Sequence, residues 1–269
     1  MAPRQSSGVV LIHPDMMIRA FVFDIYNTAL EVGPAPPDSE ARWLRLWQDP
    51  GRFPAGREMP NAGEASAPLS LAEFDAKCEE AIGLARANAQ ARGIQFPESF
   101  WPDITRAVLP GLGLLSQDLL DDFLYEHAQL QRTARLMPGA GAALAELRRR
   151  GSVLGLCSNC QPYTLREMAS ALAQADLSME IFDPRLCFYS FRAGICKPDP
   201  KAFGTLGHEL ATRQITPAQA IFVGDRLDKD IHPAQSQGWQ TWHLAASPQG
   251  RPGGDWFQFL EWVRSDLTP

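Results

Sequence analysis

The residue of this sequence best suited to chemistry is Asp24, which directly follows an apolar run at residues 18–23. The run is too short to cross a membrane and is rich in residues that favour β-strands. A carboxylate at the carboxyl end of a strand in a parallel sheet lies where ligands bind. A turn-forming Asn27 and the hydroxyl of Thr28 follow. The pattern predicts that Asp24 is a nucleophile or a metal ligand.

A second acidic segment follows the apolar run at residues 220–223, where Asp225, Asp228 and Asp230 crowd together. Neighbouring carboxylates raise one another's pKa unless a cation offsets their charge. Mg²⁺ prefers a few carboxylates together with water and phosphate oxygens. We therefore expect Asp24 and Asp225, with Asp228 or Asp230, to share a Mg²⁺ ion. The alternative is an acidic loop in which Asp230 caps a helix.

Two further segments carry polar side chains after predicted strands. Ser158 and Asn159 follow the run at residues 152–157, and they can donate hydrogen bonds to an oxyanion at the start of a helix. Lys197 follows the run at residues 186–190 and can neutralise charge between a nucleophile and its substrate. Taken singly, a Ser-Asn pair in a loop usually only stabilises a turn, and a lone lysine is more often solvated.

Five short runs of β-branched or aromatic residues predict strands, and helical segments separate all but the first two. These runs are residues 18–23, 152–157, 186–190, 220–223 and 240–244. Strands that alternate with helices form parallel sheets with right-handed crossovers. We expect an α/β fold with a doubly wound parallel sheet, that is, a Rossmann-like core.

The segment between the first two predicted strands departs from this alternation. It begins with a Pro/Gly/Ala-rich loop that extends to about Pro68 and then shows helical patterns, without an evident strand. The helical patterns cover residues 71–92, 98–108 and 117–132. We expect an all-helical cap at residues 33–132, inserted into a core made of residues 16–32 and 133–269. In this position the cap would form a lid over the site.

The overall composition narrows the class of protein. The formal net charge of −6 gives no electrostatic basis for binding nucleic acid or an anionic membrane. The amino-terminal residues lack a signal-peptide profile, and Met16 or Met17 is an alternative start. Five cysteines without disulfide spacing suit a reducing cytoplasm. We interpret Cys157 and Cys160, a C-x-x-C pair, as a buried thiol in a strand and a loop thiol near a pocket, because no second pair or helix context supports zinc or redox chemistry.

The four polar segments, in this order, resemble the motifs of the haloacid dehalogenase superfamily, whose members are mostly phosphohydrolases. Residues 24–30 resemble the first motif, Asp-x-Asp-x-Thr, and Ser158-Asn159 the second. Lys197-Pro198 resembles the third motif, and residues 224–230 resemble the fourth, Gly-Asp-x-x-x-x-Asp. The helical insertion lies where that family carries its cap.

The resemblance implies a phosphohydrolase that acts on a small phosphorylated metabolite. Asp24 would attack phosphorus and form an aspartyl-phosphate, while Ser158 holds the phosphoryl oxygens and Lys197 balances charge. The implied Mg²⁺ ligands are Asp24, Asp225, Asp230 and the backbone carbonyl of Tyr26. The residues expected to bind substrate or steady its site are Thr28, Ser158, Asn159 and Lys197.

Tyr26 departs from the family pattern, since most phosphatases of the family carry a second aspartate there as general acid and base. A phenol with a pKa near ~10 is poorly matched to that task at neutral pH. A substrate with a good leaving group needs less protonation. Alternatively, 2-haloacid dehalogenases of the superfamily carry tyrosine at this position and use no metal, although they lack the Gly-Asp of the fourth motif. The third hypothesis is a very slow or non-catalytic ligand-binding protein.

Overall fold

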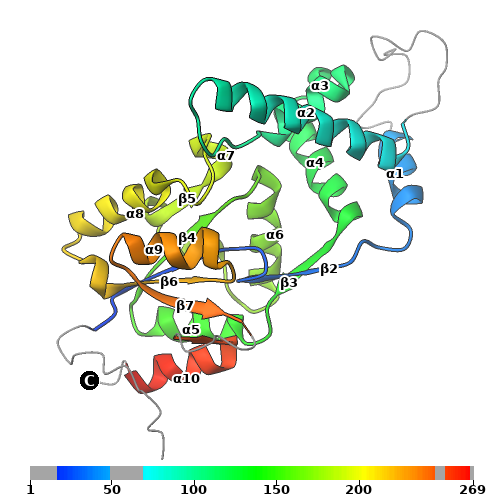
Figure 1. Cartoon of the computed structure of the whole chain (residues 1–269). Coiled ribbons are helices and arrows are strands. Elements are labelled where there is room, and N and C mark those ends of the chain that lie inside the picture. Colours follow the sequence, from blue (N-terminus) through cyan, green and yellow to red (C-terminus); the bar gives the residue numbers. More distant parts are fainter. Residues whose placement is uncertain (1–16, 49–68, 246–251, 267–269) are drawn as a thin grey trace, which may run out of the picture.

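The computed structural model describes residues 17–48, 69–245 and 252–266 (Figure 1). Its centre is a six-stranded parallel sheet in the order β5-β4-β1-β6-β7-β8. The strands are β1 (Ala20–Phe23), β4 (Val153–Ser158), β5 (Cys187–Tyr189), β6 (Ala220–Gly224), β7 (Gln240–Leu244) and β8 (Gly253–Gly254). Because the chain winds from β1 toward both edges, the predicted doubly wound α/β fold is confirmed.

Helices cover both faces of this sheet (Figure 1). One face packs against α5 (Ala140–Arg149), α6 (Pro162–Ala173) and α10 (Trp256–Asp266). The other face packs against α8 (Pro200–Thr212) and α9 (His232–Ser236). A four-residue helix, α7 (Ser190–Ala193), and the loop that carries Lys197 follow β5 and lead to α8.

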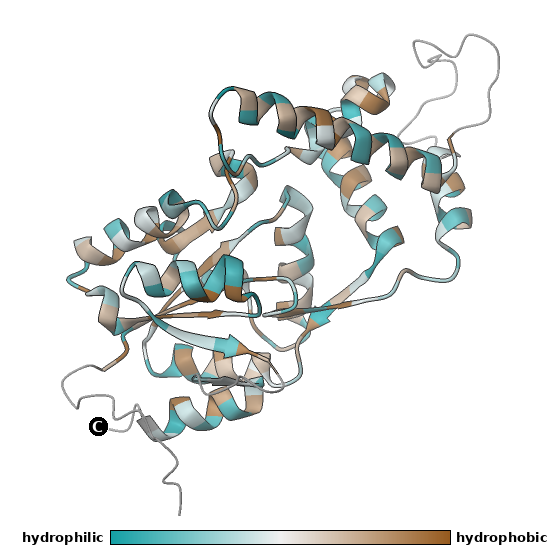
Figure 2. Cartoon of the chain, viewed as in Figure 1, coloured by the Kyte–Doolittle hydropathy of each residue, from teal (hydrophilic) through white to brown (hydrophobic). Residues whose placement is uncertain are grey.

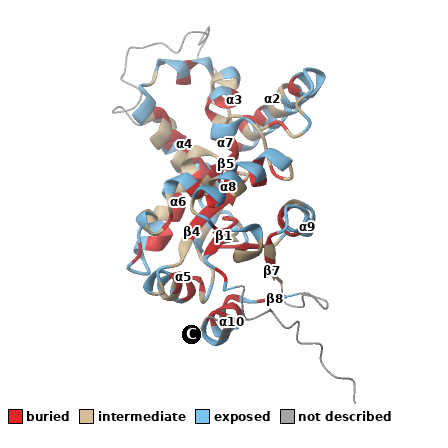
Figure 3. Cartoon of the chain, turned by 90° about the vertical axis from the view of Figure 1, so that its left-hand side faces the viewer, coloured by how far each residue is buried: buried red, intermediate tan, exposed pale blue. Residues whose placement is uncertain are grey.

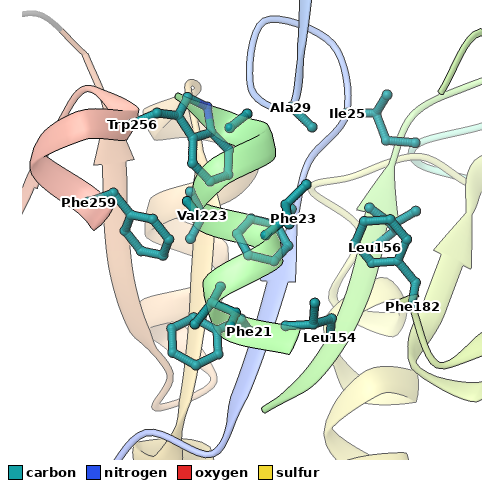
Figure 4. Close-up of a cluster of buried hydrophobic side chains, with 14 of the residues drawn as sticks. Phe21, Phe23, Ile25, Ala29, Leu154, Leu156, Phe182, Val223, Trp256 and Phe259 are labelled. Carbon is teal, nitrogen blue, oxygen red and sulfur yellow. The ribbon is translucent and has the colours of Figure 1, made fainter. Parts of the chain in front are cut away.

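Strand β1 lies between two apolar cores, which explains why its sequence is apolar throughout. Side chains alternate between the faces of a strand, so Phe21 and Phe23 enter the first core while Ala20 and Val22 enter the second. Figure 4 shows Phe21 and Phe23 beside Phe259 of α10, and all β1 side chains are buried (Figure 3). A parallel strand covered on both faces reads as a continuous apolar run.

A helical insertion separates β1 from β4 in the chain. Its helices are α1 (Ser39–Gln48), α2 (Leu71–Ala91), α3 (Trp101–Val108) and α4 (Gln117–Gln131). They enclose a third apolar core around Trp43, Phe74 and Phe123, while polar residues line their outer surfaces (Figure 2). Ser70 caps α2 in a reciprocal capping box with Glu73, which fixes where that helix begins.

The expectation of a strand-free region that begins with a long loop is wrong in two places. Strand β2 (Leu30–Gly33) pairs antiparallel with β3 (Thr133–Leu136), and the two form a ribbon that leads into and out of the insertion. Four-residue strands with a charged cross-strand pair, Glu31 and Arg135, carry little apolar pattern. Helix α1 also forms within the expected loop, because Trp43 and Leu46 pack into the third core. The rest of that loop, residues 49–68, and Met16 lie outside the described residues.

No helix among the described residues is both long and apolar enough to span a membrane.

Candidate active site

The polar residues that follow β1, β4 and β6 meet at one edge of the sheet, together with Lys197. The backbone N–H of Asp24 donates to the carbonyl of Val223 at 3.0 Å, which holds the ends of β1 and β6 side by side. A cavity of about 130 Å³ opens at this edge. Its lining includes all the predicted site residues except Thr28, namely Asp24, Tyr26, Ser158, Asn159, Lys197, Asp225 and Asp230.

Lys197 is buried against two of the acids. Its Nζ lies 2.7 Å from Oδ1 of Asp24 and 2.6 Å from Oδ1 of Asp230. Burial opposes the charge of the ammonium group, but the two carboxylates outweigh this cost and raise the pKa of Lys197 above its ordinary value. Lys197 is therefore a fixed positive charge beside Asp24.

Three carboxylates, those of Asp24, Asp225 and Asp230, lie around one point. One oxygen from each lies within 4.8 Å of the other two. Burial raises the pKa of Asp225, and the negative charge of Asp24 raises it further. Among the described residues, Lys197 is the one cation that forms ion pairs with these three acids, so the cluster has the charge and the oxygen ligands for a hard divalent cation such as Mg²⁺.

The structure separates the two acids that the sequence offered as further ligands. Asp228 is exposed and binds the guanidinium of Arg226 through two hydrogen bonds of 3.0 Å. Asp230 is buried, and its second carboxylate oxygen accepts the backbone N–H of Arg226 at 3.0 Å. Asp230 therefore joins the acidic cluster, whereas Asp228 points elsewhere.

Gly224 makes room for Asp230. A Cβ added at Gly224 would lie 2.6 Å from the Cβ of Asp230, which is closer than two carbon atoms approach. The turn after β6, Leu227–Ile231, is a π-helical turn that brings Asp230 back against the end of its own strand. Such turns occur frequently at functional sites.

Asn27 and Thr28 shape the loop that follows Asp24. Asn27 has a φ of +57°, in the left-handed region that asparagine tolerates. Thr28 is buried behind the cavity, with its hydroxyl 3.5 Å from Oδ1 of Asp225. Its backbone carbonyl accepts a 2.8 Å hydrogen bond from the indole N–H of Trp256 on α10. The carboxyl-terminal helix thus anchors this loop.

The amide side chain of Asn159 is occupied by the backbone of Lys197. It donates to the Lys197 carbonyl at 2.9 Å and accepts from the Lys197 N–H at 2.6 Å. The side chain therefore positions the lysine loop, which differs from the expected donation to an oxyanion. The Ser158 hydroxyl makes no hydrogen bond with any of the described residues, and it lines the cavity with Asp24.

The hydroxyl of Tyr26 already has three partners. It donates to the carboxylate of Glu167, lies 2.9 Å from the hydroxyl of Thr164, and accepts from Arg132 at 2.8 Å. Burial raises the pKa of Tyr26 far above its ordinary value; Arg132 opposes the rise and Glu167 adds to it. The phenol remains protonated, and its one proton is committed to Glu167.

Arg132, Glu167 and Trp256 are site residues that the sequence analysis did not single out. Glu167 is buried on α6 and pairs with Arg132 at 3.3 Å. None of the three belongs to a motif, and they come from segments far from Asp24 in the chain. A glutamate on an otherwise apolar helix face was the one sequence signal for Glu167.

Cys157 and Cys160 are free thiols. Cys157 is buried in β4, as predicted, and Cys160, predicted as a loop thiol near a pocket, is also buried and lines a cavity. Burial raises the pKa of Cys157 to about 12. The one group of possible metal ligands within the described residues is the acidic cluster.

Comparison with known proteins adds a family and several relatives. A family model described as haloacid dehalogenase-like hydrolase matches residues 18–238. A phosphoserine phosphatase of Thermus thermophilus is 35% identical over 123 residues, which cover 46% of this chain and 44% of that protein. A glyceraldehyde 3-phosphate phosphatase of Pyrococcus furiosus is 28% identical over 133 residues, 49% of this chain and 46% of that protein. The chain thus matches less than half the length of either relative.

Solved structures of dehalogenases share the fold. A 2-haloacid dehalogenase of Pseudomonas syringae pv. tomato superposes with a TM-score of 0.56 at 18% identity, covering 92% of this chain and 99% of that one. An L-2-haloacid dehalogenase superposes with a TM-score of 0.51 at 19% identity, covering 93% of this chain and all of the other. At such low identity, this similarity concerns the fold alone.

Proposed function

The chain belongs to the haloacid dehalogenase-like hydrolases, and from this premise we propose that it is a Mg²⁺-dependent phosphohydrolase that acts on a small phosphorylated metabolite. The observation that carries the proposal is the cluster of Asp24, Asp225 and Asp230 around one point with Lys197. Displacement of halide from carbon has no use for a hard cation beside its nucleophile. Both sequence relatives bear the names of phosphatases of small phosphate esters, which supports the same choice.

In the proposed reaction, an oxygen of Asp24 attacks phosphorus, and the bond from phosphorus to the leaving oxygen breaks. Lys197 offsets the charge that gathers between Asp24 and the phosphoryl oxygens, while the free hydroxyl of Ser158 donates to one of those oxygens. Water then attacks the aspartyl-phosphate, which releases inorganic phosphate and restores Asp24.

The proposed ligands of Mg²⁺ are Asp24, Asp225, Asp230 and the backbone carbonyl of Tyr26. When bound, the ion would supply positive charge to phosphoryl oxygens and to the crowded carboxylates. Thr28 and Trp256 would act indirectly, because they hold the loop between Asp24 and the ribbon in place.

Tyr26 limits the proposed substrates to compounds with good leaving groups, such as acyl phosphates. The phenol can neither take a proton from water nor give its own to a leaving alkoxide, since Glu167 holds that proton. General acid–base assistance contributes about 10²- to 10⁴-fold to a rate. We therefore expect slow turnover of ordinary alkyl phosphates.

The same tyrosine favours one alternative function, hydrolysis at a carbon centre as in 2-haloacid dehalogenases. That reaction needs no general acid and no metal, because halide leaves as an anion. The third hypothesis, a very slow or non-catalytic ligand-binding protein, also fits a hydroxyl that is held by three partners.

Turnover of p-nitrophenyl phosphate and acetyl phosphate, with and without chelator, tests the proposal. We expect Mg²⁺-dependent release of phosphate that Asp24→Asn abolishes. Chelator-insensitive release of chloride from 2-chloropropionate would instead establish the alternative. Ligand binding without turnover of either class would leave the ligand-binding hypothesis.

A further inference from the structure

A larger cavity of about 610 Å³ adjoins the small one. We propose that this cavity binds a second anionic group of the substrate, and that Arg86 of α2 and Lys229 of the turn after β6 bind that group. The inference rests on the proposed phosphohydrolase function and names a substrate class. The class comprises compounds that carry a carboxylate or a second phosphate apart from the transferred phosphoryl group.

The two cavities share part of their lining. Tyr26, Asn159, Lys197 and Lys229 line both of them. The small cavity, at about 130 Å³, is much smaller than the larger one, at about 610 Å³. The larger cavity is therefore the adjoining space into which the rest of a substrate bound at Asp24 can extend.

The far wall of the larger cavity comes from the helical insertion and is fixed to the core. Helix α2 contributes Arg86, and the loop after it contributes Glu98. Two backbone hydrogen bonds tie that loop to the core, one from Cys196 to Phe96 at 2.7 Å and one from Glu98 to Gly194 at 3.1 Å. The side of the cavity that carries Arg86 is thus held in a defined position against the core.

Two of the four basic side chains in this cavity are already neutralised. Lys197 is bound to Asp24 and Asp230, and Arg132 is paired with Glu167. In the described ranges, neither Arg86 nor Lys229 forms an ion pair or a side-chain hydrogen bond. These two cations are therefore available to a ligand.

The two acids that line the cavity, Glu98 and Asp228, have other hydrogen-bond partners than Arg86 and Lys229. Asp228 is bound to Arg226, which lies outside the larger cavity. Glu98 accepts hydrogen bonds from its own cavity wall: the Ser190 hydroxyl, the side-chain amide of Gln161 at 3.1 Å, the Ser99 N–H at 2.8 Å and the Cys196 thiol at 3.4 Å. Neither acid forms an ion pair with Arg86 or Lys229 in the described part of the chain.

Cys196 lines the same cavity as Arg86 and Lys229. Burial and the neighbouring Glu98 raise the pKa of this thiol to about 12, while Arg86 and Lys229 both oppose that rise. Both positive charges thus act on the same thiol of the cavity lining. An anionic group bound there would meet one cation from the insertion and one from the core.

A matched pair of acyl phosphates tests the inference. Succinyl phosphate ends in a carboxylate, whereas butyryl phosphate ends in a methyl group at the same position. We expect wild-type kcat/KM to be at least about tenfold higher for succinyl phosphate, the size of one charge-assisted hydrogen bond. In Arg86→Gln this ratio should fall by about tenfold. Arg92→Gln, on an exposed residue that follows the same helix outside the cavity, should keep the wild-type ratio.

Other arms of the experiment identify the anion and separate this inference from the proposed function. The ratio of kcat/KM for 1,3-bisphosphoglycerate to that for glyceroyl phosphate, which lacks the distal phosphate, tests a distal phosphate in the same way. Equal kcat/KM within both pairs, or a ratio that survives Arg86→Gln, would overturn the inference. If no acyl phosphate is hydrolysed, the proposed function fails, and calorimetric binding of the two pairs to Asp24→Asn then decides the inference alone.

Discussion

Tyr26 limits the substrates that this site can hydrolyse, because it lies where a general acid would be most useful. Its hydroxyl is fixed by Glu167, Thr164 and Arg132, and these contacts hold the ring as part of the cavity wall. The guanidinium of Arg132 also lies 4.9 Å from the ring centre, a cation–π contact. Tyr26 is therefore a structural residue with its side chain and a candidate metal ligand with its carbonyl.

Replacing Tyr26 by aspartate should restore part of the missing acid–base assistance. We expect Tyr26→Asp to raise kcat/KM for an alkyl phosphate such as glycerol 3-phosphate by about tenfold or more, within the about 10²- to 10⁴-fold that such assistance supplies. Steady-state release of phosphate measures this. Tyr26→Asn is the matched control, since it has the same shape without a titratable proton. Equal rates in the two variants would contradict this account of Tyr26.

The loops at the strand ends, rather than the strands, set the spacing of the acids. Gly224 ends β6 at the point where Asp230 folds back over it, so the smallest added side chain would displace Asp230. Lys197 depends on the same contact, because it is bound to Asp230 at 2.6 Å.

Gly224→Ala should therefore impair the site far more than it impairs the fold. We expect at least about a tenfold loss of Mg²⁺-dependent activity, since Asp230 and Lys197 must both shift. Gly207→Ala is the control, because nothing lies within 4 Å of a Cβ added there within α8. That variant should keep full activity and gain up to ~1 kcal/mol in the free energy of unfolding. Activity near the wild-type level in Gly224→Ala would show that Asp230 is dispensable.

The elements that local pattern predicts well are those with an apolar pattern or a cap of their own. Five of the six strands of the core sheet, all but β8, and the helices α2, α3 and α4 follow from apolar runs, apolar periodicity and capping residues such as Ser70. The ribbon of β2 and β3 does not, because two four-residue strands without a continuous buried run are defined by each other rather than by their own sequences. Helix α1 was not predicted, because a proline-rich stretch precedes it and favoured a loop.

In the candidate site, the motif residues could be predicted from the sequence, whereas the supporting residues could not. Asp24 and Asp225 each follow a strand directly and Ser158 is the last residue of one, so parallel pairing alone brings them to one edge. Trp256 reaches Thr28 across 228 residues of sequence, and Glu167 meets Tyr26 across 141 residues. Such contacts arise from packing between distant segments, which no single-sequence pattern encodes.

At the scale of the whole molecule, a bound divalent cation should stabilise the folded chain. An ion that binds only the native state at 100 times its Kd adds about 2.7 kcal/mol, and each kcal/mol raises Tm by about 2–4 °C for a domain of this size. We expect Mg²⁺ to raise Tm by several degrees in calorimetry or in a thermal melt followed by circular dichroism.

Two variants show whether such a shift comes from the acidic cluster. Asp225→Asn should remove the dependence of Tm on Mg²⁺, because it takes one acid from the cluster. Asp228→Asn should preserve it, since Asp228 is exposed and bound to Arg226. An identical Mg²⁺ response in both variants would place the ion elsewhere.

The most direct test of the central claim is to trap the phosphorylated nucleophile. The protein would be mixed with ³²P-labelled acetyl phosphate and Mg²⁺, quenched in acid and digested. We predict label on the peptide that contains Asp24, release of that label by hydroxylamine, and no label when chelator is present or when Asp24 is replaced by asparagine. Phosphate release without any label on Asp24, or labelling that is unchanged by chelator, would contradict the claim that this aspartate attacks phosphorus beside a divalent cation.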